Sequence, residues 1–253
     1  KVRDRVPLYA NGWFTGDRPS AHGPREGVAG EAEWFAKGAQ AVVALGFRCL
    51  KLYPFSGTPQ TITPERLKRG VEIVRRVREA VGPDIDIAID IRARLNIGSA
   101  RRVAQQLEPY NLAWIEEPIL FDNAAAMAAF ARSISQPIAT GEQLYTRWEF
   151  REILEENAVA ILQPDICHAG GLSKLRKIAD MAETYYVSLA PHNSNGPIST
   201  VASLHLDMAI NNCHLQELFL NSLPLYQEVL TQPLKIENGY GAPPDGPGCG
   251  TDM

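Results

Sequence analysis

The chain has 253 residues, of which 45% are hydrophobic and 21% charged, a composition typical of a globular protein that can bury a sizeable core. The net charge of −4 and the pI near 5.8 argue against a nucleic-acid-binding surface, because basic residues cluster in helical stretches with interleaved acids, such as 65–78. The four cysteines form no CxxC pair, no apolar stretch is long enough to span a bilayer, and the N-terminus lacks a signal-peptide core, so we predict a soluble cytoplasmic protein without nucleic-acid or membrane partners.

Strand patterns alternate with helix patterns along the chain. A first strand over 6–10 precedes a Gly- and Pro-rich loop over 11–27. Further strands are predicted at 47–53, 85–90, 112–117, 137–142, 160–165, 187–192 and 214–219, and helices at 28–45, 64–81, 100–107, 123–133, 146–156, 172–185 and 198–211. Eight strands joined by seven helices imply a parallel sheet, which repeated right-handed crossovers close most naturally into an α/β barrel.

Side-chain parity indicates which face of each strand points into the barrel. In IDIAID (85–90) the isoleucines share one face, while Asp90 shares the other face with small or polar residues. Asp90 is therefore expected to point inward at the C-terminal mouth. Lys51 and Tyr53 share a face by the same rule, and Arg92 lies on the Asp90 face if the extended backbone continues.

The C-terminal part has a different character. It is rich in Gly and Pro, as in GYGAPPDGPGCG, and has no helical period. We therefore divide the chain into a barrel over 1–220, which carries the site, and an extended segment over 221–253 that packs on the outside of the barrel or on another domain.

Three acidic residues close successive apolar strands with equal spacing. Asp90, Glu116 and Glu142 are 26 residues apart, about one strand, loop, helix and loop, so each barrel unit delivers one oxygen ligand to the same place. Carboxylates with open positions suit Mg²⁺. A single acid at a strand end more often caps the following helix, but three at equal spacing favour a metal. Glu117 has the opposite parity and is expected to hold a basic group behind the site.

Two further residues at strand ends form a candidate general base. His192 and Asp165 end neighbouring strands, where a carboxylate can fix the imidazole tautomer and raise its basicity. Lys51 is a counter-charge for a substrate carboxylate, a base with a lowered pKa, or a salt-bridge partner of one of the acids. Glu217 ends the eighth strand and can hydrogen-bond the substrate or the developing oxyanion. The other histidines fit loop, helix or strand surfaces: His22, His168, His205 and His214.

Together these groups suit removal of a proton next to a carboxylate. The metal would neutralise charge on the carboxylate oxygens while His192 takes the α-proton. The resulting enediolate can expel a β-hydroxyl, which is dehydration, or be reprotonated, which is racemisation.

Several stretches resemble the enolase superfamily, and within it the mandelate racemase-like sugar-acid dehydratases of the galactonate type. They are KVRDRVPLYA, GFRCLKLYPF, IDIRAR, LEPYNLAWIEEP, PIATGEQLYTRWEF, ILQPDICHAGGL, LAPHNSNGPI and LQE. The resemblance implies a modified TIM barrel, (β/α)7β, with Mg²⁺ on the three acids, the His192–Asp165 base and Glu217. It also implies an acid-sugar substrate, a homo-oligomer (dimer or octamer), and an N-terminal α+β capping domain that this chain lacks.

The sequence departs from this family at two positions. Galactonate-type dehydratases have a His acid two residues after the first ligand, where this chain has Arg92. Racemases and cycloisomerases often have a second Lys at the position of Tyr53, which makes two-base racemisation less favoured. Tyr53 or Arg92 is then the proton donor.

Three functions follow from these observations. The first is a Mg²⁺-dependent dehydratase of an aldonate or aldarate. The second is an epimerase, racemase or cycloisomerase that uses the same enediolate. The third, of a different class, is a degenerate barrel that binds metal or ligand without turnover.

Overall fold

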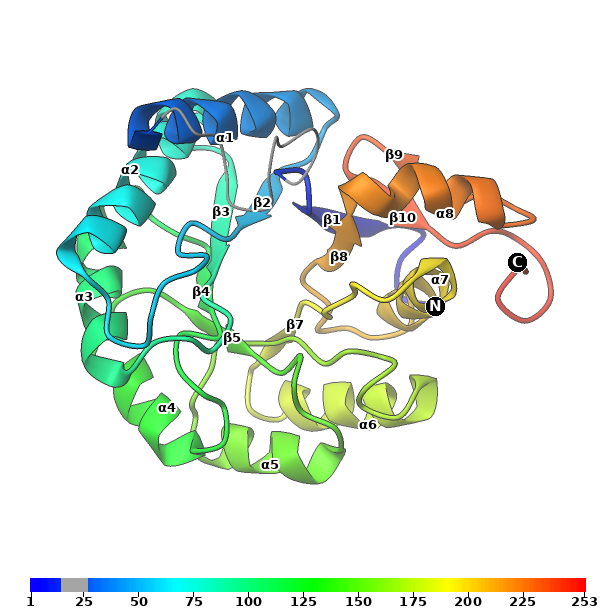
Figure 1. Ribbon diagram of the computed structural model, residues 1–253. Coiled ribbons are helices and arrows are strands. Elements are labelled where there is room, and N and C mark those ends of the chain that lie inside the picture. Colours follow the sequence, from blue (N-terminus) through cyan, green and yellow to red (C-terminus); the bar gives the residue numbers. More distant parts are fainter. Residues whose placement is uncertain (15–26) are drawn as a thin grey trace.

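A closed barrel of parallel strands forms the centre of the computed structural model, which describes residues 1–14 and 27–253 (Figure 1). Each strand from β1 to β6 pairs in parallel with the next, and β8 pairs with β1. A bridge between Leu189 and Cys213 joins the β7 and β8 sides. The barrel strands are β1 (Val6–Asn11), β2 (Cys49–Leu52), β3 (Asp86–Asp90), β4 (Trp114–Glu116), β5 (Ile138–Thr140), β6 (Ile161–Leu162), β7 (Ser188–Leu189) and β8 (Gln216–Phe219). The predicted α/β barrel is confirmed.

Helices cover the outside of the barrel (Figure 1). Their starts follow local capping: Thr63 accepts a hydrogen bond from the Arg66 amide, with Pro64 in the first turn, and Asn96 and Asn123 cap the next two helices. The helices between strands are α1 (Gly27–Ala44), α2 (Pro64–Val81), α3 (Ile97–Leu107) with the short η1 (Glu108–Tyr110), α4 (Ala124–Ala131), α5 (Arg147–Glu155), α6 (Leu172–Glu183) and α7 (Pro197–Asp207). The predicted helix over 198–211 ends earlier, at Asp207.

The barrel interior is filled by one side chain from each of the eight strands or from a residue directly beside the strand. The rings of Tyr9 and Trp114 meet edge to face at 5.3 Å, and small side chains leave room for them. This interior layer consists of Tyr9, Cys49, Ala88, Trp114, Ala139, Ile161, Ala190 and Leu215. The barrel is therefore a packed core and has no pore at this level.

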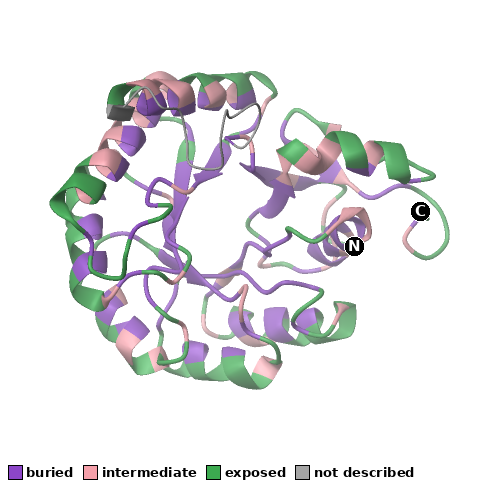
Figure 2. Ribbon diagram, in the orientation of Figure 1, coloured by how far each residue is buried: buried purple, intermediate pink, exposed green. Residues whose placement is uncertain are grey.

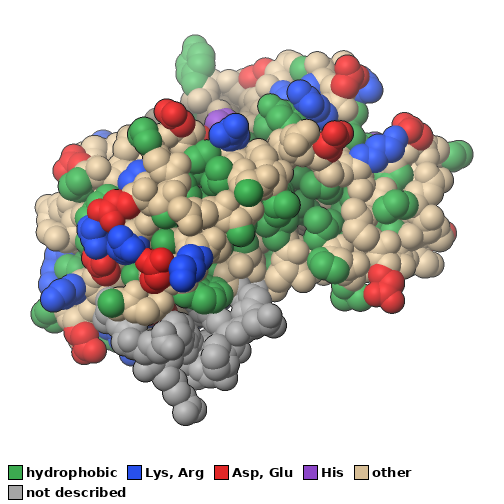
Figure 3. Space-filling view, turned by 90° about the horizontal axis from the view of Figure 1, so that it is seen from above, with side chains coloured by type: hydrophobic (Ala, Val, Ile, Leu, Met, Phe, Trp, Pro, Cys, Tyr) green, Lys and Arg blue, Asp and Glu red, His purple; other side chains and the backbone are tan. Residues whose placement is uncertain are grey.

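The opposite face of each strand packs against the helices. Ile87 and Ile89 belong to this outer apolar core, whereas Ala88 belongs to the interior layer, as parity predicted. Figure 2 shows buried residues along the strands and on the barrel-facing sides of the helices. On the face seen in Figure 3, acidic and basic side chains are interspersed without a broad patch of one sign.

The C-terminal segment is more regular than the predicted extended segment. It contains η2 (Leu220–Ser222), α8 (Leu223–Val229), β9 (Lys235–Glu237) and β10 (Tyr240–Ala242). Asn238 and Gly239 both have positive φ angles, 50° and 74°, and make the two-residue turn between β9 and β10. β10 pairs antiparallel with β1, placing Gly241 opposite Val6, so the segment packs on the barrel as a hairpin. Only the extended, irregular character was predicted wrongly, because the Asn-Gly turn and the short helix give the segment local structure, while its packing on the barrel agrees with the prediction.

Among the described residues, no helix combines the length and apolar character needed to cross a bilayer. The described residues also contain no separate α+β capping domain.

Candidate active site

A layer of polar side chains lies two residues beyond the apolar interior layer. Because strand side chains alternate, these residues face the same barrel axis at the C-terminal mouth, where active sites of such barrels lie. The fifth strand is the exception, since Gly141 takes the position and Glu142 follows it. The polar layer consists of Asn11, Lys51, Asp90, Glu116, Gln163, His192 and Glu217. Asn11 and Gln163 were not predicted, although the spacing of two from the interior layer would have found them.

Three acidic side chains meet as the sequence predicted. One ligand oxygen each from Asp90, Glu116 and Glu142 lies within 4.8 Å of the others. Asp90 and Glu116 are register partners on β3 and β4. Burial raises the pKa of both carboxyls, and repulsion from neighbouring carboxylates raises it further. The residues fit a hard divalent cation, because oxygen donors of like charge held this close are stabilised by positive charge between them.

Lys51 forms buried ion pairs with two carboxylates. Its Nζ lies 2.5 Å from Glu116 Oε1 and 2.7 Å from Glu217 Oε1, and all three side chains are fully buried. Burial alone would lower the Lys51 pKa, but the charges of Glu116 and Glu217 outweigh it and hold the pKa well above its usual value. Of the roles considered from sequence, the geometry shows the salt bridge and not a base with a lowered pKa.

The His192 imidazole is oriented by Asp165. Its Nδ1 lies 2.7 Å from Asp165 Oδ2, which leaves Nε2 facing Glu142 Oε2 at 3.4 Å and Glu217 Oε2 at 3.9 Å. Asn195 Nδ2 also donates to both Asp165 oxygens. Burial opposes the imidazolium charge, but Glu217, Asp165 and Glu142 together raise the His192 pKa to about 9. Sequence reasoning did not identify Asn195.

Tyr53 and Arg92 lie on the side of the mouth near β2 and β3. Asn11 Nδ2 donates to the Tyr53 hydroxyl at 2.6 Å and to Glu217 Oε1 at 2.7 Å. The Arg92 guanidinium carbon lies 5.5 Å from the Tyr53 ring centre. None of the ion pairs found among residues 1–14 and 27–253 includes Arg92.

The backbone after Asp90 does not continue as an extended strand. Asp90 Oδ1 accepts a hydrogen bond from the Arg92 amide at 2.6 Å, and Arg92 and Ala93 adopt left-handed φ angles of 59° and 54°. The condition for placing Arg92 on the Asp90 face, a continuing extended backbone, is therefore not met, because this turn ends the alternation. The Arg92 side chain is exposed at the rim.

Glu117 has the opposite parity to Glu116, as expected, but no basic side chain among the described residues pairs with it. It is fully buried, accepts from the Gly141 amide at 3.2 Å and Gln143 Nε2 at 2.8 Å, and also accepts from the Thr140 hydroxyl. Burial raises its pKa to about 7. The expected basic group is thus replaced by neutral donors of the next strand end and loop.

His168 lies closer to the site than its sequence context indicated. Its Nδ1 lies 2.8 Å from the Glu142 carbonyl oxygen, and its ring stacks on His192 with 6.4 Å between centres. His205 bonds the Cys249 carbonyl away from the mouth, and His22 lies outside the described residues. Exposed apolar side chains near the mouth include Leu120, Tyr145 and Trp148.

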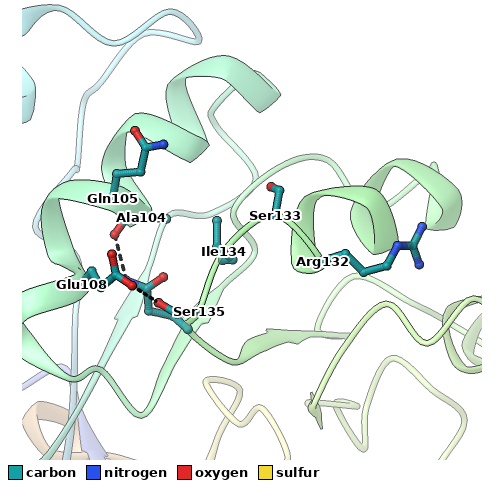
Figure 4. A pocket seen from close by; sticks show the side chains of 8 residues that line it. Ala104, Gln105, Glu108, Arg132, Ser133, Ile134 and Ser135 are labelled. Carbon is teal, nitrogen blue, oxygen red and sulfur yellow. Dashed lines mark hydrogen bonds between the residues drawn. The ribbon is translucent and has the colours of Figure 1, made fainter.

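A separate cavity of about 420 Å³ lies at the opposite end of the barrel, between the C-terminal ends of α3 and α4 (Figure 4). Two hydrogen bonds join residues of its lining: Ser135 donates to Glu108, and Gln136 donates to the Ala104 carbonyl. The Arg132 side chain points away from the others in Figure 4. This cavity contains no residue of the mouth, so it does not carry the predicted chemistry.

Comparison with known proteins agrees with this geometry. The family described as Enolase C-terminal domain-like matches residues 34–253. The chain belongs to this family. Two curated relatives of this enolase C-terminal domain are a D-gluconate dehydratase of Thermoproteus tenax, 34% identical over 99% of the chain, and a D-galactonate dehydratase of Ralstonia nicotianae, 36% identical over 100% of it. The chain spans 48% and 64% of their lengths.

Solved structures give the same family relationship. A putative dehydratase from Salmonella enterica serovar Typhimurium superposes with a TM-score of 0.92 at 32% identity, and one from Mesorhizobium loti with 0.88 at 32%. Both superpositions include the whole of this chain, which spans 66% of the Salmonella chain and 65% of the Mesorhizobium chain. The resemblance to mandelate racemase-like dehydratases is confirmed.

Proposed function

We propose that this enolase C-terminal domain carries the active site of a Mg²⁺-dependent dehydratase of a sugar acid, an aldonate or aldarate. The observation that carries the proposal is the approach of His192 Nε2 to within 3.4 Å of Glu142, one of the three clustered acids. A base and a cation site therefore share one space, as removal of a proton next to a carboxylate requires. The dehydratases among the relatives support the same reaction class.

His192 would accept the α-proton at Nε2, because Asp165 holds Nδ1. Asp90, Glu116 and Glu142 would hold the Mg²⁺, which would supply positive charge for the two oxygens of the substrate carboxylate as the enediolate forms. Glu142 raises the His192 pKa less when its own charge is neutralised, which favours the neutral imidazole that a base requires.

Loss of the β-hydroxyl requires a proton donor. The Tyr53 hydroxyl is the candidate, because Asn11 donates to its oxygen and so leaves its own hydrogen free to be donated. Burial raises the Tyr53 pKa, so the phenol carries its proton at neutral pH but releases it less readily. Arg92 provides positive charge at the rim, where an anionic substrate enters, and stays the alternative donor. Lys51 and Glu217 complete the polar wall, where the Lys51 ammonium balances the charges of Glu116 and Glu217.

The proposal also includes a capping domain, an oligomeric state and a cellular location. The family resemblance implies an N-terminal α+β capping domain, and the exposed Leu120, Tyr145 and Trp148 offer apolar contact for it near the mouth. A homo-oligomer, dimer or octamer, and a cytoplasmic location belong to the same proposal.

The test is a library of aldonic and aldaric acids incubated with Mg²⁺ in ²H₂O. It uses this chain and a fusion with a relative's capping domain. Dehydration predicts a 2-keto product that His192→Asn and Asp90→Asn abolish. Exchange or inversion at the α-carbon without a 2-keto product would instead indicate an epimerase. Cation binding without exchange or product from any acid would indicate a barrel that only binds.

A further inference from the structure

Gln163 is a buried polar residue of the mouth that the reaction does not use directly. Its side chain is 1% exposed and follows β6 at the level of the polar layer. Nε2 donates to Glu116 Oε2 at 2.6 Å and makes a longer contact of 3.4 Å with the Tyr9 hydroxyl. Oε1 is buried and has no hydrogen-bond partner within residues 1–14 and 27–253. The orientation of the amide is fixed, because the opposite one would place Oε1 against the Glu116 carboxylate.

The hydrogen bonds of Glu116 distinguish its two oxygens. Oε2 accepts from both Gln163 and the Trp114 indole, the latter at 3.1 Å. Oε1 accepts from Lys51, its single donor in the part of the chain that the structure describes. Since each carboxylate oxygen offers about two lone pairs, Oε2 is saturated and Oε1 keeps one lone pair for a further partner.

Among the described residues, both Gln163 and Gln216 have an unpartnered Oε1, so the partner of Nε2 distinguishes them: a carboxylate for Gln163 and backbone carbonyls for Gln216. A buried acceptor without a donor lowers stability, and an apolar side chain of similar shape would avoid that loss. Stability alone therefore explains neither amide well. For Gln163, the short bond to a carboxylate of the three-acid cluster indicates what the amide does instead.

We propose that Gln163 is a positioning residue for the cation site. Together with Trp114 it holds Glu116 Oε2 away from the ion, so that Glu116 binds through Oε1 while Asp90 and Glu142 supply the other protein oxygens. This inference rests on the proposed metal dependence and extends it to a residue that contacts neither the cation nor the substrate.

The test measures cation affinity directly. Mg²⁺ binding to the chain is followed by calorimetry, and Mn²⁺ binding by the loss of the free-ion electron paramagnetic resonance signal. Gln163→Met removes the hydrogen bond and keeps the volume, and Gln163→Asn keeps the amide one methylene too short. Both are expected to bind cations about 10- to 100-fold more weakly.

Gln216 provides a matched control. It is equally buried, donates to the Pro191 and Glu217 carbonyl oxygens, and also has an unpartnered Oε1, but it makes no contact with Glu116. Gln216→Met is expected to change cation affinity less than twofold. In thermal unfolding without cation, Gln163→Met should be no less stable than Gln216→Met, and only Gln163→Met should lose most of the stabilisation by Mg²⁺.

Two results would overturn the inference while leaving the metal proposal intact. One is wild-type cation affinity in both Gln163 variants. The other is equal weakening by Gln163→Met and Gln216→Met, which would indicate general loosening of the barrel. Absence of saturable cation binding in the unsubstituted chain would overturn the metal dependence itself and this inference with it.

Discussion

Replacing Lys51 by Met removes the positive charge that lies between Glu116 and Glu217. Both contacts are short, 2.5 and 2.7 Å, and neither the ammonium nor the carboxylates have exposed surface. Removing one partner of such a buried pair leaves uncompensated charge, which typically lowers stability by about 3–5 kcal/mol. Repulsion between the two remaining carboxylates acts in the same direction, so we expect the Lys51→Met chain to lose an amount in this range.

The assay is equilibrium urea unfolding of metal-free protein at pH 7. The matched control is Arg176→Met, since Arg176 pairs with Asp180 at 2.8 Å but both side chains are about half exposed. Such a surface pair contributes about 0–1 kcal/mol. The loss from Lys51→Met should shrink at lower pH, where a buried carboxyl can take up a proton. Equal losses in the two variants would refute the reasoning, because they would show that the Lys51 charge is not shielded from water.

Cation binding should respond to Lys51→Met in the opposite sense to stability. The ammonium touches Glu116, a proposed ligand, so its positive charge opposes a divalent ion there. Calorimetry should therefore show tighter Mg²⁺ binding in the less stable variant. Weaker binding would mean that Lys51 chiefly organises the ligands and that its charge is secondary.

Three further predictions concern pH, backbone and substrate. The folded His192 pKa of about 9 lies above the usual value of 6.5, so in metal-free protein its stabilisation is fully present below about pH 6.5 and is lost as the pH rises through 9. The free-energy difference between wild type and His192→Asn in urea unfolding should fall over this interval, by at most about 3 kcal/mol, and a flat profile would contradict the assigned ion pairs. Gly239→Ala should lower the melting temperature more than Gly57→Ala. Both glycines have φ angles above 70°, so both substitutions strain the backbone. Only at Gly239 would the new Cβ also clash, because it would lie 2.5 Å from the Gly46 carbonyl oxygen. Arg92→Met should weaken binding of the acid sugar about tenfold in a binding titration, whereas equal weakening by Arg94→Met would point to general rim charge.

Strand parity explains how much of the site could be predicted from sequence. A period of two places Asp90, Glu116 and Glu217 on the inward face without any knowledge of the contacts, and the parallel topology then brings the strand ends together. Gln163 obeys the same parity, but an amide within an apolar run has no chemical signature of its own. Its role appears only when its partner is known.

Other features depend on backbone conformations that violate the local pattern. The left-handed turn at Arg92 follows from a hydrogen bond of Asp90 to the Arg92 amide, and an alternation rule cannot anticipate it. The neutral partners of Glu117 come from another strand end and loop, so their identity requires the fold. The hairpin at Asn238 and Gly239 did have a local signal, the Asn-Gly pair. This pair stands in a Gly- and Pro-rich stretch, a composition that favours irregular structure.

Because Gly141 occupies the inward position just beyond the fifth strand, the three equally spaced acids are not held equally rigidly by the barrel. A side chain at position 141 would have its Cβ 2.9 Å from the Phe150 ring and 3.1 Å from the Gln163 backbone nitrogen, so there is no room for one. The φ angle of 136° also favours glycine here. Asp90 and Glu116 extend directly from strands, whereas Glu142 reaches in from the turn beyond Gly141 and its side chain is 17% exposed. When ions of different radius bind, we therefore expect the Glu142 side chain to move, while the ligand oxygens of Asp90 and Glu116 keep their separation.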